Sequence, residues 1–192
     1  DFYLVNSTFQ YFPGIIISHS KDLVHWEHIG HALIENAYLQ LDDVDDGKGV
    51  WAPDISYYNG YYYIFYPYVV SDIENPGGYV FKNYMIKSKK PEGPYSEPLL
   101  INETGIDPSH FVDDDGTHYM LYNPAATLVQ LNNDCTETVG KPEMIWEGTG
   151  RNYPEAPHLF KMDGYYYILL AEGGTGYNHC ITVARSRNLK GP

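Results

Sequence analysis

The stretch YPEAPHLFKMDGYYYILL, residues 153–170, carries the signal that decides the fold. In it, an acidic residue stands between prolines, an apolar run follows, and an Asp-Gly turn leads into a tyrosine-rich run. The same order of features occurs at residues 51–66 (WAPDISYYNGYYYIFY) and 106–122 (IDPSHFVDDDGTHYMLY). Short strands joined by tight turns and repeated about every 50 residues are typical of the blades of a β-propeller.

The three copies share a framework but differ beside the repeated proline. Aligned on Pro53, Pro108 and Pro157, the copies are 55 and 49 residues apart, and this region holds Ala52, Asp107 and Glu155 in turn. A stretch beside the proline that holds alanine in one copy and an acid in the other two is not set by packing. The first strand of each propeller blade lines the central axis, so we expect the two carboxyl groups to face one pocket. Such a pair suits acid/base chemistry on a sugar.

The bulk composition excludes several classes of partner. The chain has 192 residues, enough for one domain, and a formal net charge of -13, which argues against binding nucleic acid or an anionic membrane. No apolar run approaches the roughly 18 residues of a membrane-spanning helix. The 20 tyrosines and 3 tryptophans fit half-buried strands, and a minority of them are available to stack on sugar rings.

Two cysteines, Cys135 and Cys180, fall in different repeats. Two such residues make neither a disulfide framework nor a metal site, so we expect both to be free and structural and predict no metal ligands. The compartment, secreted or cytoplasmic, and the oligomeric state are left open by the sequence.

The repeat divides the chain into blades at residues 1–48, 49–104, 105–152 and 153–192. The first and the last of these hold only part of a blade. The predicted fold is therefore an all-β propeller of which about three and a half blades are present. An open propeller would expose strand edges and half a core, so we expect these residues to be part of a longer chain.

Six phrases, in this order, resemble glycoside hydrolase family 43, the five-bladed propeller β-xylosidases and α-L-arabinofuranosidases. They are STFQYFPG (7–14), SHSKDLVHW (18–26), GVWAPD (49–54), GIDPS (105–109), EAPHL (155–159) and AEGGT (171–175). The resemblance covers nearly the whole chain. It implies an inverting exo-glycosidase that releases terminal xylose or arabinofuranose from xylan-derived oligosaccharides.

The resemblance implies three carboxylates. Glu155 matches the general acid that protonates the leaving oxygen, and Asp107 matches the aspartate that orients this acid and raises its pKa. A like charge nearby does favour the protonated form. The third, a general base, matches an aspartate upstream of Asp1 and so is not in the sequence, which implies that these residues alone are inactive.

Pocket-lining positions of the family match Phe9, Trp51 and Ala52, and more weakly Thr175. No redox or organic cofactor is implied. The resemblance allows a structural calcium ion on the axis of the complete domain, with ligands outside these residues.

A non-catalytic, lectin-like propeller that binds carbohydrate is the competing hypothesis. It would keep the aromatic residues but would have no use for a carboxylate pair, so the closeness of Asp107 and Glu155 discriminates between the two. Other polar residues have structural interpretations. We expect His110 and His158 to be structural histidines and Glu172 to be a buried hydrogen-bonding partner. Turn formers before glycine are Asn59, Asp113, Asp114, Asp115 and Asp163, and the tryptophans of outer strands, Trp26 and Trp146, are expected in the core.

Overall fold

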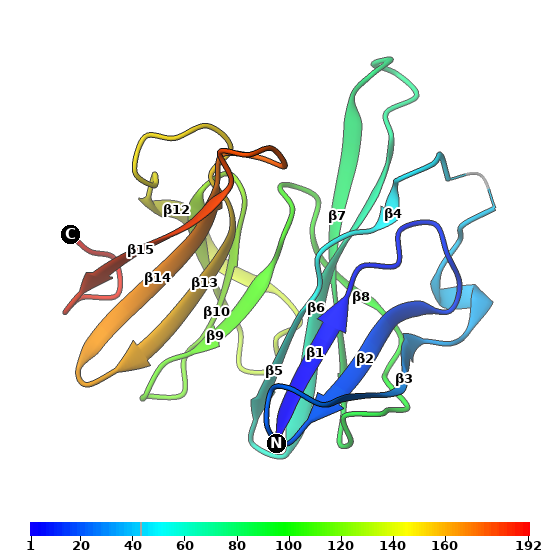
Figure 1. Cartoon of the computed structure of the whole chain (residues 1–192), viewed down its shortest axis with the longest axis horizontal. Helices are drawn as coiled ribbons and strands as arrows, with labels where there is room; N and C mark the ends of the chain where they lie inside the picture. Colours follow the sequence, from blue (N-terminus) through cyan, green and yellow to red (C-terminus); the bar gives the residue numbers. More distant parts are fainter. Residues whose placement is uncertain (43) are drawn as a thin grey trace. The chain divides into compact units, whose positions relative to one another are not determined.

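The computed structural model describes residues 1–42 and 44–192 (Figure 1). These residues form fifteen β-strands and one short 3-10 helix, η1 (Asn36–Tyr38), so the predicted all-β class is confirmed. The part of the chain that the structure describes contains no helix whose length and hydropathy would let it span a bilayer. The chain divides into two compact units, Asp1–Thr104 and Gly105–Pro192.

Unit 1 contains two antiparallel sheets. The first consists, in order, of β1 (Phe2–Asn6), β2 (Gly14–Ser20) and β3 (Trp26–Leu33). The second runs β4 (Gly49–Val50), β6 (Tyr61–Ser71), β7 (Tyr79–Ser88) and β8 (Leu99–Asn102), and β5 (Asp54–Tyr58) also pairs with β6. The long β6–β7 hairpin is visible in Figure 1, and its connection spans residues 72–78.

Unit 2 also contains two antiparallel sheets. One has the order β12 (Thr138–Trp146), β11 (Ala126–Leu131), β10 (His118–Tyr122) and β9 (Ser109–Val112). The other has the order β13 (Glu155–Met162), β14 (Tyr165–Glu172) and β15 (Cys180–Ser186). Neighbouring strands of the four sheets follow one another in sequence, except that β4 pairs with β6 past β5. This order is the meander of a propeller blade.

Asn-Gly and Asp-Gly pairs close the equivalent hairpins of the second and fourth sheets. Tyr58 pairs with Tyr61 across Asn59-Gly60, and Met162 pairs with Tyr165 across Asp163-Gly164. All four turn residues have positive φ, 47° and 85° in the first turn and 52° and 73° in the second. Two-residue turns of this kind match the twist of the strands they join, and they favour Asn or Asp followed by Gly. The turn prediction for Asn59 and Asp163 is confirmed.

Each unit has its own hydrophobic core between its two sheets. In unit 1 fully buried aliphatic side chains of β2, β3 and β6 pack together, and they include Ile15, Ile17, Leu33 and Ile64. In unit 2 the core is formed by Phe111, Leu121, Leu128, Leu159, Ile168 and Leu170. Burying one such side chain contributes about 1.5–3 kcal/mol, so these layers hold each pair of sheets together.

The expectation that Trp26 belongs to the core is wrong. Trp26 opens the outer strand β3, as predicted, but 39% of its surface is exposed, and its indole N–H donates to the Leu23 carbonyl at 3.2 Å. The outermost strand of a blade has solvent on one side, so an aromatic residue there satisfies its N–H locally. Trp146, at the end of β12, does pack against the core of unit 2.

Candidate active site

Unit 2 brings the two acidic phrases together. Asp107 lies just before β9, and Glu155 is the first residue of β13, a strand of the neighbouring sheet. The backbone N–H of Ala156 donates to Asp107 Oδ2 at 3.2 Å, and the Ser109 hydroxyl donates to the Pro157 carbonyl at 2.5 Å. The Asp107 carboxylate is therefore hydrogen-bonded to the residue that follows Glu155. The enzyme hypothesis places the two carboxyl groups in one pocket, whereas the lectin hypothesis does not need them to meet.

Asn123, which follows β10, fastens the same two phrases to each other. Its backbone N–H donates to the Ile106 carbonyl at 2.9 Å, and its side-chain amide donates to the Pro154 carbonyl at 3.1 Å. The N–H of Ala125 donates to that same carbonyl at 3.1 Å. Asn123 thus fixes the residues directly before Asp107 and Glu155, a role that the sequence analysis missed.

The backbone around the carboxylates departs from regular strand geometry. Asp107 has a φ of 53° and Ala156 a φ of 51°, in the left-handed region that non-glycine residues seldom occupy. The β13–β14 pairing also shifts register between Glu155 and His158, as in a β-bulge. Bulges redirect side chains, and strained residues of this kind gather at functional sites.

Both carboxyl groups hold their protons more tightly than usual. Burial raises the pKa of Asp107 to about 6; the Glu155 carboxylate adds to this rise, and the hydrogen bond from Ala156 opposes it. Burial also raises the pKa of Glu155, against an opposing effect of His179. A carboxyl group that stays protonated in mildly acidic solution is suited to donating a proton.

Thr175 is exposed in the connection between β14 and β15, and the start of this connection lies beside the residues before Glu155. The Gly173 N–H donates to the Asn152 carbonyl at 2.7 Å, and a Cβ added to Gly174 would lie 3.0 Å from the Tyr153 ring. His179, in the same connection, is hydrogen-bonded through Nδ1 to the Gly174 carbonyl at 2.8 Å. The charge effect of His179 on Glu155 was not foreseen from the sequence.

The other predicted pocket residues belong to unit 1. Phe9 and Val50 exchange backbone hydrogen bonds of 2.9 and 3.0 Å, which sets Phe9 beside the segment that holds Trp51 and Ala52. Phe9 has a φ of 51° and is 41% exposed, and Ala52 is exposed as well. The Trp51 indole N–H donates to the Gly47 carbonyl at 2.9 Å. Unit 1 therefore places these three residues together, with Phe9 and Ala52 exposed and Trp51 half-buried.

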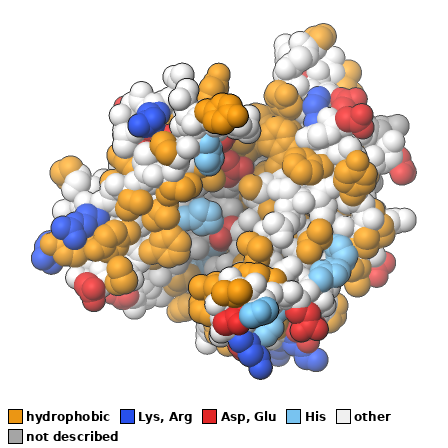
Figure 2. All heavy atoms as spheres, in the orientation of Figure 1, with side chains coloured by type: hydrophobic (Ala, Val, Ile, Leu, Met, Phe, Trp, Pro, Cys, Tyr) orange, Lys and Arg blue, Asp and Glu red, His pale blue; other side chains and the backbone are white. Residues whose placement is uncertain are grey.

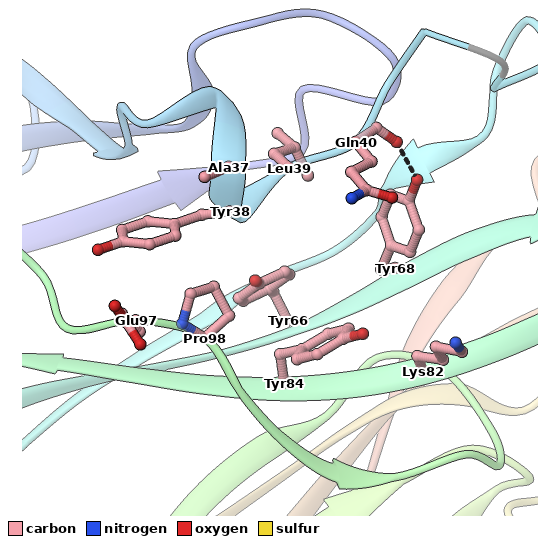
Figure 3. A pocket seen from close by; sticks show the side chains of 10 residues that line it. All are labelled: Ala37, Tyr38, Leu39, Gln40, Tyr66, Tyr68, Lys82, Tyr84, Glu97 and Pro98. Carbon is pink, nitrogen blue, oxygen red and sulfur yellow. Dashed lines mark hydrogen bonds between the residues drawn. The ribbon is translucent and has the colours of Figure 1, made fainter.

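Unit 1 also contains a tyrosine-rich pocket of about 550 Å³, shown in Figure 3. It lies between the segment 37–40 and the strands β6 and β7, and the Tyr68 hydroxyl donates to the Gln40 carbonyl at its edge. Its lining residues are Ala37, Tyr38, Leu39, Gln40, Tyr66, Tyr68, Lys82, Tyr84, Glu97 and Pro98. None of the predicted site residues is among them, so this hollow is separate from the residues matched to the family.

Three expectations about buried polar groups can be compared with the structure. Glu172 is fully buried and accepts hydrogen bonds from Thr149 and Thr182, which confirms its structural role. Neither cysteine forms a disulfide, as expected. His110 is buried beside His118, and burial lowers its pKa to about 3, which confirms it as a histidine of the interior. The prediction of no metal ligands, however, missed that Cys135 lies against these two histidines.

Known proteins match the chain along its whole length. The family described as Glycosyl hydrolases family 43 matches residues 1–192. A protein named beta-xylosidase from Bacillus subtilis is 39% identical over 206 residues, covering 100% of this chain and 38% of that protein. A protein named non-reducing end alpha-L-arabinofuranosidase BoGH43B from Bacteroides ovatus is 40% identical over 199 residues, covering 100% of this chain and 36% of that protein. The chain thus spans less than two fifths of the length of these relatives.

Solved structures agree with the sequence matches. The GH43 protein BlXynB from Bacillus licheniformis is 60% identical to this chain, with a TM-score of 0.93 over 99% of this chain and 38% of that one. A xylan beta-1,4-xylosidase from Bacillus halodurans has 37% identity and a TM-score of 0.91 over 99% of this chain and 38% of its own. The propeller prediction is confirmed, with the chain covering only part of that fold, and the protein belongs to glycosyl hydrolase family 43.

Proposed function

We propose that the protein to which these residues belong is an inverting exo-glycosidase that releases terminal xylose or arabinofuranose from xylan-derived oligosaccharides. Family membership and relatives named as xylosidases and arabinofuranosidases support this activity. The observation that carries the proposal is the hydrogen bond from Ala156 to Asp107 Oδ2, because it fastens the Asp107 carboxylate beside Glu155 in a place where both carboxyl pKa values are raised.

In this proposal Glu155 is the general acid. As the bond between the anomeric carbon and the glycosidic oxygen breaks, Glu155 gives its proton to that oxygen, and the leaving sugar departs as a neutral alcohol. Asp107 acts through Glu155 and is a positioning residue. We assign its charge, when ionised, to disfavouring ionisation of Glu155, in addition to the burial that raises the pKa of Glu155 in this structure. The hydrogen bond that Asp107 accepts from the Ala156 N–H holds the start of β13 in place.

The water that replaces the leaving group attacks from the opposite face of the sugar ring. A general base must take one proton from that water, and inversion requires about 6.5–9.5 Å between acid and base to leave room for it. We assign the base to a carboxylate outside these 192 residues. Residues 1–192 alone are then expected to hydrolyse no glycoside.

The aromatic and small residues of unit 1 would hold the terminal sugar. Trp51 offers an apolar face to a pyranose or furanose ring, and the exposed Phe9 ring offers a second one. Ala52 leaves space where the equivalent position of the next copy carries Asp107. Thr175 offers a hydroxyl group for a sugar hydroxyl. Neutral xylo-oligosaccharides or arabinoxylan fragments are the substrates that we assign to the whole protein.

The test replaces Glu155 in the full-length protein and varies the leaving group. Glu155→Ala should lower kcat/KM for xylobiose by about 10²–10⁴-fold, since its leaving alcohol needs a proton. The loss should be much smaller for a dinitrophenyl xyloside, whose leaving group departs without one. Glu147→Ala, at an exposed glutamate in the same unit, is the matched control and should keep full activity on both. Equal losses on the two substrates, or retained turnover of xylobiose, would refute the role of Glu155.

The same variant separates the enzyme from a sugar-binding module. Glu155→Ala should still bind xylobiose in calorimetry, because the acid acts on the transition state more than on the bound substrate. Wild-type protein that binds the sugar but turns over neither xylosides nor arabinofuranosides would favour the lectin-like hypothesis.

A further inference from the structure

A buried group of two histidines and a cysteine lies in the first sheet of unit 2, apart from the residues assigned to catalysis. His110 is on β9, His118 is on β10, and Cys135 follows β11. His110 pairs with Met120, and His118 pairs with Val112, so the two histidines stand at diagonal positions of adjacent strands. Side chains in this relation lie on the same face of the sheet and within reach of each other.

Three potential ligand atoms converge at this place. His110 Nε2 and His118 Nδ1 are 2.9 Å apart, and Cys135 Sγ lies 3.2 Å from His118 Nδ1 and 3.7 Å from His110 Nε2. The exposed fractions are 8% for His110, 4% for His118 and 0% for Cys135. A buried cysteine is common, but two buried histidines beside it are unusual, because leucine or valine would fill the same volume without any polar atom to satisfy.

The backbone holds each donor in place. The histidines sit on paired strands, and the thiol comes from a tight turn in which the Cys135 N–H donates to the Asn132 carbonyl at 3.0 Å. The Asn132 side chain locks this turn, since its amide donates to the Thr136 hydroxyl and its carbonyl accepts from the Thr136 N–H, both at 2.8 Å. A rigid set of ligand atoms loses little conformational freedom when it binds an ion.

We propose that His110 Nε2, His118 Nδ1 and Cys135 Sγ bind one zinc-class transition-metal ion. Zinc takes imidazole nitrogen at about 2.0–2.1 Å and thiolate sulfur at about 2.3 Å in tetrahedral geometry. Those lengths place two nitrogens about 3.3 Å apart and each nitrogen about 3.6 Å from sulfur. The triangle in this structure, 2.9, 3.2 and 3.7 Å, needs to open by only about 0.4 Å along two sides.

The donor chemistry selects the kind of ion. One thiolate and two imidazoles suit zinc and its borderline-soft neighbours, whereas calcium and magnesium take oxygen ligands. On binding, the Cys135 thiol releases its proton to solvent, and each imidazole keeps its single proton on the nitrogen that faces away from the ion. Three protein ligands leave one tetrahedral position for water. The ion would cross-link β9, β10 and the turn after β11.

Metal titration of the reduced, chelator-treated full-length protein tests the proposal. Zinc competition against a chromophoric chelator should reveal one equivalent bound by wild-type protein and by the matched control Cys180→Ser. Cys135→Ser should bind this equivalent at least about 100-fold more weakly, since removing a ligand costs more than removing its hydrogen-bonded support. Cobalt(II) in place of zinc should give a thiolate-to-metal charge-transfer band in wild type and in Cys180→Ser only.

Thermal unfolding supplies a second readout. Zinc should raise the Tm of wild type and Cys180→Ser by several degrees and leave His110→Gln unchanged, because only an ion bound to the native state stabilises it. The wild-type cobalt spectrum keeps the test decisive even where a variant fails to fold. Absence of the charge-transfer band, or equal zinc affinity in wild type and Cys135→Ser, would show that the three residues are only a hydrogen-bonded part of the core.

Discussion

Asp107 differs from an ordinary turn aspartate in its backbone and in its surroundings. Its φ is 53°, its carboxylate accepts a hydrogen bond from Ala156, and burial together with the charge of Glu155 raises its pKa to about 6. A turn former would instead lie exposed with a low pKa, as Asp115 does, where the hydrogen bond from the Thr117 N–H lowers the pKa. Asp107 is thus held at a cost in stability, as is common where a site is built for function.

That cost predicts a pH-dependent gain in stability for Asp107→Asn. The raised pKa means that native Asp107 binds its proton more tightly than the unfolded chain does, so wild-type stability falls as pH rises from about 4 to about 6. Asparagine does not titrate and still accepts the Ala156 N–H. The variant should therefore gain about 1–3 kcal/mol on wild type between pH 4 and pH 7, measured by urea unfolding.

Asp115→Asn gives the control of opposite sign. Because the pKa of Asp115 is lowered in the native state, its ionised carboxylate stabilises the native state above about pH 4. The stability of Asp115→Asn should therefore fall relative to that of wild type as pH rises through this range. An Asp107→Asn variant whose stability parallels that of wild type at every pH would mean that the carboxylate is not strained in the native protein.

The residues that the sequence could reveal are those that the repeat exposes. Asp107 and Glu155 stand out because they lie one and two residues before the repeated proline, where the copy at residues 51–66 carries Ala52 and Trp51. Asn123 does not stand out, because it donates to backbone carbonyls of residues that are distant in sequence. His179 does not stand out either, because it lies in the loop after β14, where it is hydrogen-bonded to the Gly174 carbonyl. Cys135 was missed for a similar reason, because 17 residues separate it from His118, and only the strand pairing makes them neighbours.

At the scale of elements, Glu172 joins the end of β14 to its surroundings. Its carboxylate accepts from the Thr149 N–H at 2.7 Å, from the Thr149 hydroxyl at 2.7 Å and from the Thr182 hydroxyl of β15 at 2.9 Å. Burial alone would raise the pKa of Glu172, but these donors outweigh it and the pKa is lowered. Gly148 lies so close that an added Cβ would be 2.3 Å from Glu172 Oε1. The charged carboxylate of Glu172 therefore helps to hold β14, β15 and residues 148–149 together.

Glu172→Ala should therefore destabilise the protein by about 2–4 kcal/mol, because it leaves a backbone N–H and two hydroxyl groups without their acceptor. This difference in stability between wild type and variant should shrink as pH falls below about 4. The pKa of Glu172 is lowered in the native state, so the stabilisation by its charge is lost as the carboxylate becomes protonated. Urea unfolding of both proteins at pH 7 and pH 3.5 measures this. Glu147→Ala, at an exposed glutamate, should change stability by less than about 0.5 kcal/mol. A similar loss in both variants would contradict the structural role of Glu172.

The sequence predicted correctly those elements whose conformation depends on local residue chemistry. The Asn-Gly and Asp-Gly turns and the tyrosine-rich strands after them could be predicted from the sequence. Both turn positions require a positive φ, and few residues other than Asn, Asp and Gly adopt it readily. The bulge after Glu155 could not, because it depends on the bonds that β13 makes to the neighbouring sheet. The exposure of Trp26 was missed because outer strands and core strands share the same aromatic composition.

At the scale of the whole molecule, the chain leaves much apolar surface uncovered. Hydrophobic side chains are spread over the face in Figure 2, and on β15 Ile181 and Val183 are 60% and 57% exposed. On β1, Phe2 and Leu4 are 43% and 44% exposed. Single exposed apolar residues are ordinary, but pairs on the edge strands of two sheets are suited to packing against further strands. This agrees with a chain that spans about 38% of the relatives it matches.

The stereochemistry of the product tests the whole proposed mechanism, because it depends both on the acid of unit 2 and on a base from elsewhere in the protein. If water attacks the face opposite the departing oxygen, a β-xyloside must release α-xylose first, and mutarotation follows later. Proton NMR of the full-length enzyme acting on the dinitrophenyl β-xyloside, whose leaving group adds no second xylose, should show the α-anomeric signal growing before the β signal. A retaining enzyme has its carboxylates only about 5–5.5 Å apart and would release the β-anomer through a covalent intermediate. Initial formation of β-xylose would therefore overturn the direct-displacement mechanism while leaving Glu155 as an acid.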